Sequence, residues 1–220
     1  MKEKVLITGA SGFIGSFIVE EGLERGYEVW AAVRKSSSRQ FLQDERIHFI
    51  ELDLSSQERL VEQLRGHEFD YVVHAAGVTK CKNKQDFFRV NTEGTHHLVA
   101  ALQELQMPVK RLVYLSSLSI FGPIREQQPY EEIRDTDTPQ PNTAYGESKL
   151  QAEKLLTGLP VIILRPTGVY GPREKDYFLM AKSISRPETS FASSPSHATK
   201  LMRANNTDMK NNFFMLIQIL

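Results

Sequence analysis

Apolar residues occur along this chain in short, nearly continuous runs, separated by longer stretches in which they recur every three or four positions. Short apolar runs rich in β-branched residues are typical of strands buried on both faces of a parallel sheet. A spacing of three and four is typical of helices that bury one face. The runs predict six strands, at residues 4–8, 28–34, 47–53, 71–77, 111–117 and 160–166.

The stretches with helical spacing lie between these predicted strands, at residues 13–26, 56–66, 87–106 and 144–158. Three of them end near a glycine, Gly26, Gly66 and Gly158, as helices with a glycine C-cap do. Alternating strands and helices predict an α/β fold with an open, doubly wound parallel sheet, Rossmann-like, in three αβα layers. Ligands of such sheets bind beyond the carboxyl ends of the strands.

The regular pattern stops before the end of the chain. Residues 122–143 are polar and hold four prolines, which predicts a long irregular loop, and loops of this length in compact domains usually serve function. After residue 182 the helical spacing is lost. We therefore expect one domain over residues 1–182 and a separate tail over 183–220.

Charge and composition exclude several classes of partner. The 27 basic and 27 acidic residues balance, so no long-range field attracts nucleic acid or an anionic membrane. No apolar run reaches the length of a membrane span, and the start of the chain lacks the apolar run of a signal peptide. The single cysteine, Cys81, fits a reducing compartment. We expect a cytoplasmic protein without nucleic-acid or membrane partners.

The first predicted strand runs directly into three glycines in "TGASGFIG", residues 8–15. Between a strand and a helix, this spacing is typical of a dinucleotide site. Gly9 would form the tight turn, Gly12 would let a pyrophosphate approach the backbone, and Gly15 would let the helix pack on the strand. The amide groups of the helix N-terminus would bind the phosphates, and Thr8 would brace the turn.

The end of the second predicted strand indicates which dinucleotide binds. NAD sites normally place an acidic residue there to hold the ribose, whereas this chain has Arg34. Because a guanidinium suits a 2′-phosphate, the residue favours NADP, with NAD possible. The alternative is that Arg34 is only a solvated surface cation.

Six further motifs follow the glycines in a fixed order: "ELDL" (51–54), "HAAG" (74–77), "VNTEGT" (90–95), "LSSLSIFG" (115–122), "YGESK" (145–149) and "RPTGVYGPR" (165–173). With them, residues 4 to about 182 resemble the extended short-chain dehydrogenase/reductase family, of the NAD-dependent epimerase/dehydratase type. The resemblance implies hydride transfer through a bound nicotinamide cofactor.

The resemblance also implies a catalytic set. Tyr145 and Lys149 lie four residues apart and share one helix face, so the ammonium is expected to move the pKa of the phenol toward neutrality. Tyr145 would then be the general acid/base, and Lys149 would also bind the nicotinamide ribose. Ser117 would hydrogen-bond the reacting oxygen, with Ser116 and Ser119 as alternatives. Asn91 would support the site from behind.

Other implied cofactor contacts are weaker. Asp53 would bind the adenine amino group beside Leu54, or would only form a strand-end turn or a helix N-cap. His74 is interpreted as a packed histidine and not as a base. His48, His96 and His97 have no spacing that suits a metal, and we expect none. The full set of expected cofactor residues is Thr8, Gly9, Ser11, Gly12, Phe13, Ile14, Gly15, Arg34, Asp53, Leu54, Ala75, Ala76, Gly77, Tyr145, Lys149, Pro166, Thr167 and Val169.

Family members of this type continue into a substrate domain that residues 183–220 do not resemble. We expect that domain to be largely missing, and the tail to be its remnant or replacement. The leading hypothesis is an epimerase or dehydratase acting on a nucleotide-linked sugar, as a homodimer. An NADPH-dependent carbonyl reductase and a non-catalytic dinucleotide-binding module are the alternatives.

Overall fold

The computed structural model describes residues 2–123, 132–134 and 136–184. The chain divides into two units, Met1–Thr167 and Gly168–Leu220. The first unit contains all six strands of the sheet. The sequence had placed a domain boundary after residue 182, and residues 185–220 of the predicted tail lie outside the described part.

Six parallel strands form one sheet in the order β3-β2-β1-β4-β5-β6, which confirms the predicted fold. The order reverses between β1 and β4, and a doubly wound sheet binds ligands at such a switch point. The strands are β1 Lys4–Thr8, β2 Glu28–Val33, β3 His48–Glu51, β4 Tyr71–His74, β5 Arg111–Leu115 and β6 Val161–Leu164.

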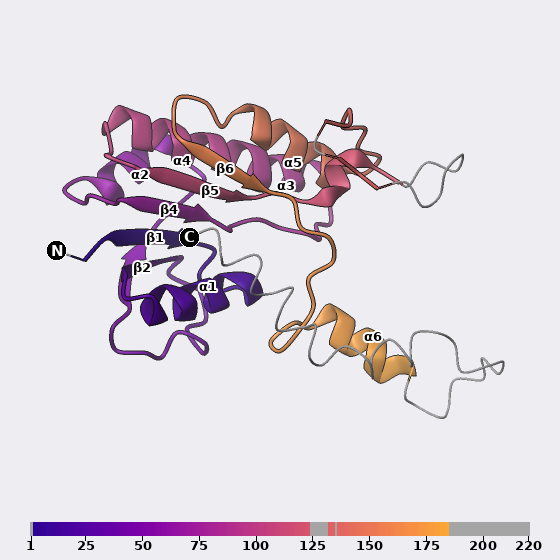
Figure 1. Cartoon of the computed structure of the whole chain (residues 1–220), viewed down its shortest axis with the longest axis horizontal. Coiled ribbons are helices and arrows are strands. Elements are labelled where there is room, and N and C mark those ends of the chain that lie inside the picture. The colour runs from indigo at the N-terminus through magenta and orange to yellow at the C-terminus, as the bar shows by residue number, and fades with distance from the viewer. Residues whose placement is uncertain (1, 124–131, 135, 185–220) are drawn as a thin grey trace. The chain divides into compact units, whose positions relative to one another are not determined.

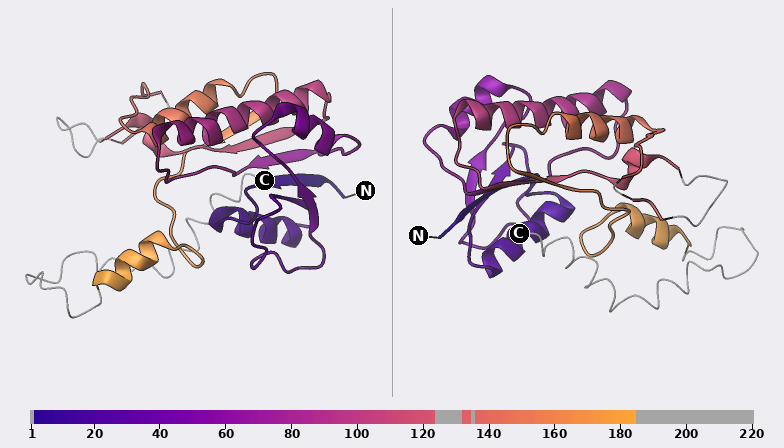
Figure 2. Two further views of the ribbon diagram at one scale, coloured as in Figure 1. Left: turned by 180° about the vertical axis from the view of Figure 1, so that it is seen from behind. Right: turned by 45° about the horizontal axis from the view of Figure 1, so that its top comes forward.

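Helices cover both faces of this sheet (Figure 1). One face carries α1 (Phe13–Glu24). The other carries α2 (Gln57–Leu64), α3 (Lys84–Phe87), α4 (Gly94–Glu104) and α5 (Ala144–Lys154). The views in Figure 2 show the same separation of α1 from the other helices. The described part of the first unit therefore has the predicted three layers.

Alternate side chains of the strands supply the core. Leu6, Val72, Leu112 and Tyr114 are fully buried and belong to one apolar cluster with α2, α4 and α5. On the opposite face α1 packs close to the sheet, because a Cβ atom built at Gly22 would lie 3.0 Å from a Val29 methyl group. Burial on both faces explains why the strands appear in the sequence as continuous apolar runs.

Several predicted boundaries were wrong. Residues 75–77 and 116–117 leave the sheet as irregular backbone beyond β4 and β5. The predicted helix 87–106 contains a π-helical turn, η1 (Phe88–Glu93), between α3 and α4, and a 3₁₀ turn, η2 (Leu118–Phe121), follows β5. Gly26 and Gly66 directly follow the C-cap residues of α1 and α2 with positive φ, but Gly158 lies three residues past the C-cap of α5.

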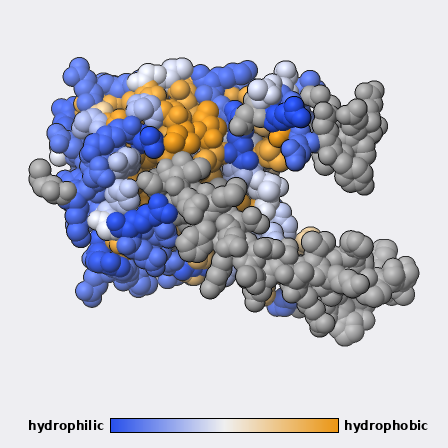
Figure 3. All heavy atoms as spheres, viewed as in Figure 1, coloured by the Kyte–Doolittle hydropathy of each residue, from blue (hydrophilic) through white to orange (hydrophobic). Residues whose placement is uncertain are grey.

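β6 lies at one edge of the sheet and pairs with β5. Each of its four residues is only half-buried, and Figure 3 shows apolar atoms gathered in this region of the surface.

In the second unit, α6 (Asp176–Ile184) exposes Tyr177, Phe178, Leu179 and Met180. Of the predicted loop 122–143, residues 124–131 and 135 lie outside the described part.

Candidate functional site

The glycine turn after β1 packs against the backbone that follows β4. Gly9 has a φ of +69°, and a Cβ atom there would lie 2.7 Å from the backbone of Ala75 and Ala76. A Cβ atom at Gly15 would overlap the Gly9 carbonyl oxygen. Only glycine fits these two positions, which agrees with the tight turn and the close helix packing expected from the sequence.

Helix α1 begins at this turn with its first amide groups uncapped by side chains. Gly12 is the N-cap residue, it makes no side-chain capping hydrogen bond, and the first turn has no acidic residue. The first-turn amides of a helix carry partial positive charge and point outward from its N-terminus. The arrangement therefore suits an anionic group such as a pyrophosphate.

A cavity of about 340 Å³ opens beside the turn, at the carboxyl ends of β1, β2 and β4. Ten of the expected cofactor residues line it: Thr8, Gly9, Ser11, Gly12, Arg34, Asp53, Leu54, Ala75, Ala76 and Gly77. The expected residues Phe13, Ile14, Gly15, Tyr145, Lys149, Pro166 and Thr167 are not part of its lining. Val169 belongs to the second unit, Gly168–Leu220.

Other residues line the cavity that sequence reasoning missed: Ala32, Val33, Ser37, Leu52, Ser55, Val78, Arg89, Val90 and Gly94. Four of them (Val33, Leu52, Ser55 and Val78) directly neighbour an expected cofactor residue, and Ala32 and Ser37 lie within three positions of Arg34, so extending each motif by a few positions would have found these six. Arg89 is a separate case, because it comes from η1 and forms an ion pair with Asp86 at 2.7 Å. No signal in the sequence connected it to the cavity.

Arg34 directly follows β2 and lines the cavity with an exposed side chain. Its backbone amide donates a hydrogen bond to the Ser37 hydroxyl at 3.0 Å, which holds the turn after the strand. Lys35 and Ser36, which follow it, are exposed and do not line the cavity. Of the adjacent cations Arg34 and Lys35, only Arg34 therefore lines the cavity.

Asp53 lies in the turn between β3 and α2, and its carboxylate has local partners. It accepts hydrogen bonds from the Ser55 amide and hydroxyl at 3.0 and 2.6 Å and from Arg59 at 2.6 Å. The Ser55 hydroxyl, then the Ser55 amide and Arg59, lower the pKa of the carboxyl to about 2. The carboxylate therefore forms the strand-end turn that the sequence offered as an alternative, while the residue also lines the cavity.

Ser117 and Tyr145 face each other beyond the carboxyl end of β5. Ser117 is buried and caps η2, and its hydroxyl accepts a hydrogen bond from the Ser119 amide at 3.1 Å. Burial raises the pKa of the Tyr145 phenol, and a hydrogen bond with the Ser117 side chain lowers it in part. Ser117 thus lies beside the phenol, and its hydroxyl donates a hydrogen bond to the Ser119 hydroxyl at 3.1 Å. Ser116 points instead to Glu153, at 2.5 Å.

Lys149 lies one turn after Tyr145 on α5 and is buried. Its ammonium donates a hydrogen bond to the Leu115 carbonyl at 2.9 Å and lies 4.9 Å from the centre of the Tyr114 ring. Burial lowers the pKa of Lys149 to about 8, and the charge of Glu153 opposes that effect. The expectation that Lys149 lowers the pKa of Tyr145 was wrong for this structure: burial dominates at the phenol, and the ammonium is directed at Leu115.

Asn91 connects α5 to the rest of the site. It is fully buried in η1, and its side-chain oxygen accepts a hydrogen bond from the Val78 amide at 2.8 Å. Its side-chain nitrogen donates to the Val78 carbonyl at 3.1 Å and to the Ser148 hydroxyl at 3.0 Å. All the polar atoms of the amide are therefore used to fix α5 beside the loop after β4, and a supporting role in catalysis stays a prediction.

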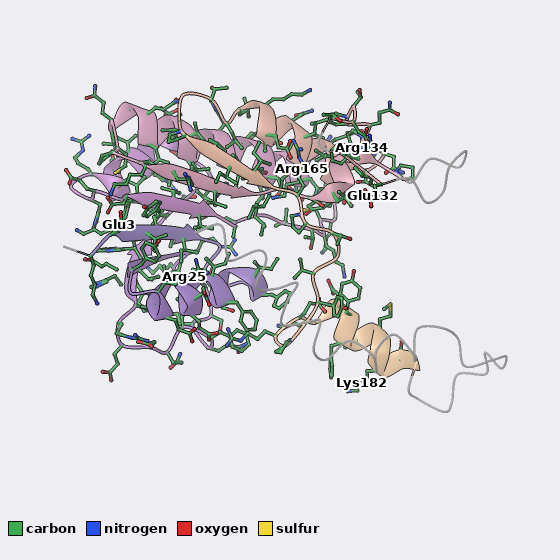
Figure 4. The ribbon with its side chains drawn as sticks, viewed as in Figure 1. Glu3, Arg25, Glu132, Arg134, Arg165 and Lys182 are labelled. Carbon is green, nitrogen blue, oxygen red and sulfur yellow. The ribbon has the colours of Figure 1, made fainter. Side chains whose placement is uncertain are left out.

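The chain after β6 returns to the serine turn. The Pro166 carbonyl accepts a hydrogen bond from the Leu118 amide at 2.9 Å, so Pro166 lies beside the segment that carries Ser117. In Figure 4 the Arg165 side chain lies between β6 and α5, where it forms an ion pair with Glu153 at 2.9 Å. Pro166 is thus placed at the serine turn and not in the cavity.

Two further features were searched for over the described residues. No three histidine, cysteine, aspartate or glutamate side chains lie close enough together there to hold a metal ion. Within the same ranges, no helix has the length and apolar character needed to span a membrane.

Comparison with known proteins places this site in a family. Residues 5–200 match the NAD dependent epimerase/dehydratase family. The chain is 32% identical over 176 residues to UDP-glucose 4-epimerase of Bos taurus, covering 72% of this chain and 49% of that protein. It is 30% identical over 224 residues to UDP-glucose 4-epimerase of Vibrio cholerae, covering 94% and 64%. The chain spans about half to two thirds of the length of these relatives.

Solved structures give the same result. The Thermus thermophilus UDP-glucose 4-epimerase complex with NAD has a TM-score of 0.69 and 31% identity, covering 78% of this chain and 57% of that one. The Bordetella bronchiseptica enzyme WbmG in complex with NAD and UDP has a TM-score of 0.67 and 26% identity, covering 79% and 56%. These neighbours contain NAD, and the comparisons give no support for a preference for NADP. The chain belongs to the NAD dependent epimerase/dehydratase family.

Proposed function

We propose that this chain binds a nicotinamide dinucleotide in the cavity beside Gly9 and supports an epimerase- or dehydratase-type reaction on a nucleotide-linked sugar. One contact carries the proposal. Gly77 lines the cavity, and a Cβ atom built on it would lie 3.1 Å from the Lys149 ammonium. The helix that carries Tyr145 and Lys149 therefore reaches the wall of the cavity. The uncapped N-terminus of α1 fits the pyrophosphate at the other end.

In this proposal the protein moves a proton and orients the substrate. Tyr145 takes a proton from a substrate hydroxyl or returns it, and Ser117 donates a hydrogen bond to the same oxygen. When bound, the nicotinamide supplies a reversible hydride acceptor. Lys149, whose pKa is lowered to about 8, remains largely charged at neutral pH and would bind the nicotinamide ribose. Asn91 keeps α5 in place during the reaction.

The first test is of the proton-transfer role. Tyr145→Phe removes the phenol and keeps the ring, and Tyr27→Phe, before β2, is the matched control. UDP-glucose and UDP-galactose, chosen because relatives act on them, are incubated with each protein and followed by proton NMR. Interconversion by the wild type and the control, with a loss of about 100-fold or more in Tyr145→Phe, supports the proposal. Equal rates in all three proteins would overturn the role of Tyr145.

We propose NADP as the preferred dinucleotide, because Arg34 lines the cavity where an acidic residue would hold the ribose of NAD. Arg34→Ala should weaken binding of NADPH about tenfold or more and leave NADH nearly unchanged. Lys35→Ala is the control, since Lys35 carries the same charge but does not line the cavity. An equal loss for both dinucleotides in Arg34→Ala, measured by calorimetry, would refute a 2′-phosphate contact.

A carbonyl reductase is the second candidate, and the same Arg34 favours it, because net reduction commonly uses NADPH. Purified protein separates the two: retained oxidised cofactor supports an epimerase or dehydratase, and freely exchanging NADPH supports a reductase. Dinucleotide binding without turnover of any substrate would favour the non-catalytic module. The expected homodimer remains a prediction, which sedimentation analysis tests.

A further inference from the structure

His74, the last residue of β4, is a polar ring in the core whose two nitrogen atoms both have partners. It is 1% exposed. Nδ1 lies 2.6 Å from the Thr8 hydroxyl oxygen, and Nε2 lies 2.9 Å from the Thr95 hydroxyl oxygen. The ring stacks on Tyr114 with a centroid distance of 5.6 Å. An apolar aromatic ring could make the same stacking contact, so packing alone does not explain a histidine.

The hydrogen atoms available fix the direction of this chain of hydrogen bonds. Thr95 donates its one hydroxyl hydrogen to the Asn91 carbonyl at 2.6 Å, so its oxygen accepts from Nε2–H of His74. Burial, with a smaller effect of the Lys149 charge, lowers the pKa of His74 to about 3. The ring is therefore neutral, and Nδ1 accepts from the Thr8 hydroxyl. Thr8 in turn accepts from the Ala76 amide at 3.3 Å.

The two ends of this chain lie at the two halves of the site. At one end, Thr8 directly precedes Gly9, whose turn packs against Ala75 and Ala76. At the other end, Asn91 bonds to Ser148 on α5, and the Ser148 hydroxyl donates to the Tyr145 carbonyl at 2.8 Å. Every step from the dinucleotide turn to α5 is therefore either a hydrogen bond or a covalent bond within one residue or its neighbour.

We propose that His74 is a positioning residue, which couples the dinucleotide turn at Gly9 to the helix that carries Tyr145 and Lys149. The proposal deepens the proposed function and rests on it for the nature of the ligand. Directed hydrogen bonds fix both the distance and the orientation of their partners, whereas an apolar ring would allow the two halves to shift against each other. His74 does not line the cavity, so it acts through Thr8 and Thr95.

Three substitutions test the two hydrogen bonds of His74 separately, the one to Thr8 and the one to Thr95. His74→Phe keeps a stacking ring and removes both hydrogen bonds. His74→Asn places an acceptor near the position of Nδ1, toward Thr8, and His74→Gln places a donor near the position of Nε2, toward Thr95. His67→Phe is the control, because the His67 ring packs on Trp30 and Phe69 before β4, away from the carboxyl ends of the strands.

Two measurements on the folded proteins follow the two hydrogen bonds. The dissociation constant for NADH, measured by its fluorescence, reports on the turn at Gly9. Hydrogen exchange of the Val78 amide, which bonds to Asn91, reports the α5 side. We expect His74→Phe to weaken NADH binding about tenfold and to speed Val78 exchange. His74→Asn should restore NADH binding more than Val78 protection, and His74→Gln should do the reverse. The control should change neither.

Two further results decide the matter. Nitrogen NMR of the wild-type protein should show the His74 imidazole in its Nε2–H form. The Nδ1–H form would overturn the direction assigned to this chain of hydrogen bonds. If His74→Phe keeps the NADH affinity and the Val78 exchange rate of the wild type, His74 serves only to pack the core. The same conclusion follows if exchange in His74→Phe is faster by the same factor over the whole sheet. If the wild type binds no dinucleotide, the proposed function fails, while Val78 exchange still tests the link.

Discussion

The ion pair between Glu153 and Arg165 fixes α5 to the end of β6, and its removal should be costly. Both guanidinium contacts are short, 3.0 Å from Nε to one carboxylate oxygen and 2.9 Å from the terminal nitrogen to the other. The Ser116 hydroxyl donates to the same carboxylate. The Glu153 side chain is 6% exposed and that of Arg165 is 23% exposed. Glu153→Gln keeps the shape of the side chain and removes the charge.

Breaking a buried ion pair by removing one partner costs roughly 3–5 kcal/mol. Because water still reaches part of Arg165, we expect the lower end, about 3 kcal/mol. With a slope of about 2 kcal/mol per molar urea, the unfolding midpoint should fall by about 1.5 M. Trp30 is the one tryptophan of the chain and lies in β2, so its fluorescence reports unfolding of the first unit.

Two variants complete this experiment. Glu147→Gln, on the exposed surface of the same helix, should cost less than about 1 kcal/mol. The double variant Glu153→Gln with Arg165→Met removes both charges and should be more stable than Glu153→Gln alone. The reasoning is refuted if Glu153→Gln unfolds within about 0.5 kcal/mol of the wild type, or if the second substitution destabilises the protein further.

Three other predictions concern the same frame. The pKa of His74 in the folded protein is about 3, below its ordinary value. Its contribution to stability is therefore full above about pH 6.5 and is lost as the pH falls toward 3. Between about pH 6.5 and 5, the free energy of urea unfolding of His74→Phe should depend less on pH than that of the wild type, and an equal pH dependence in both proteins would contradict this. Gly15→Ala should cost about 3 kcal/mol or more of stability and abolish dinucleotide binding, because the new Cβ atom would overlap the Gly9 carbonyl oxygen. Thermal unfolding measures the loss of stability, and calorimetry measures the loss of binding. An unchanged melting temperature would contradict this prediction. The Thr143 hydroxyl caps α5 by accepting from the Gly146 amide at 3.0 Å, so Thr143→Ala should cost about 1 kcal/mol in urea unfolding, while Thr143→Ser keeps the oxygen and most of the stability.

Local patterns in the sequence were sufficient for the fold and for much of the cavity. β1, β2, β4 and β5 are largely buried, and α1, α2, α4 and α5 each bury one face. The spacing of apolar residues along the chain therefore predicts both kinds of element. The glycines at positions 9 and 15 were found because a strand, a turn and a helix lie within a few residues of one another. Arg34 was found because its distance from that turn along the chain is nearly fixed in a βαβ unit.

The π-helical turn and the protonation of the site could not be found in this way. Residues 87–106 have one continuous helical spacing, and the turn at Phe88–Glu93 forms in the same segment whose Asn91 and Thr95 bond to distant groups. The pKa of Tyr145 was predicted from the charge of Lys149 alone. Its direction in the structure is set by burial, which depends on what other segments pack around the phenol.

The sequence by itself therefore determined the six-stranded sheet and the glycine turn, because these depend on residue types at short spacings. The candidates Ser117, Tyr145 and Lys149 came from its resemblance to a known family. Only the tertiary structure decided that Ser117 and not Ser116 faces the phenol, that the Lys149 ammonium turns to Leu115, and that His74 joins Thr8 to Thr95. Thr8 and His74 are 66 residues apart in the chain and adjacent in the sheet. Contacts of that kind come from strand order and register, which no local spacing encodes.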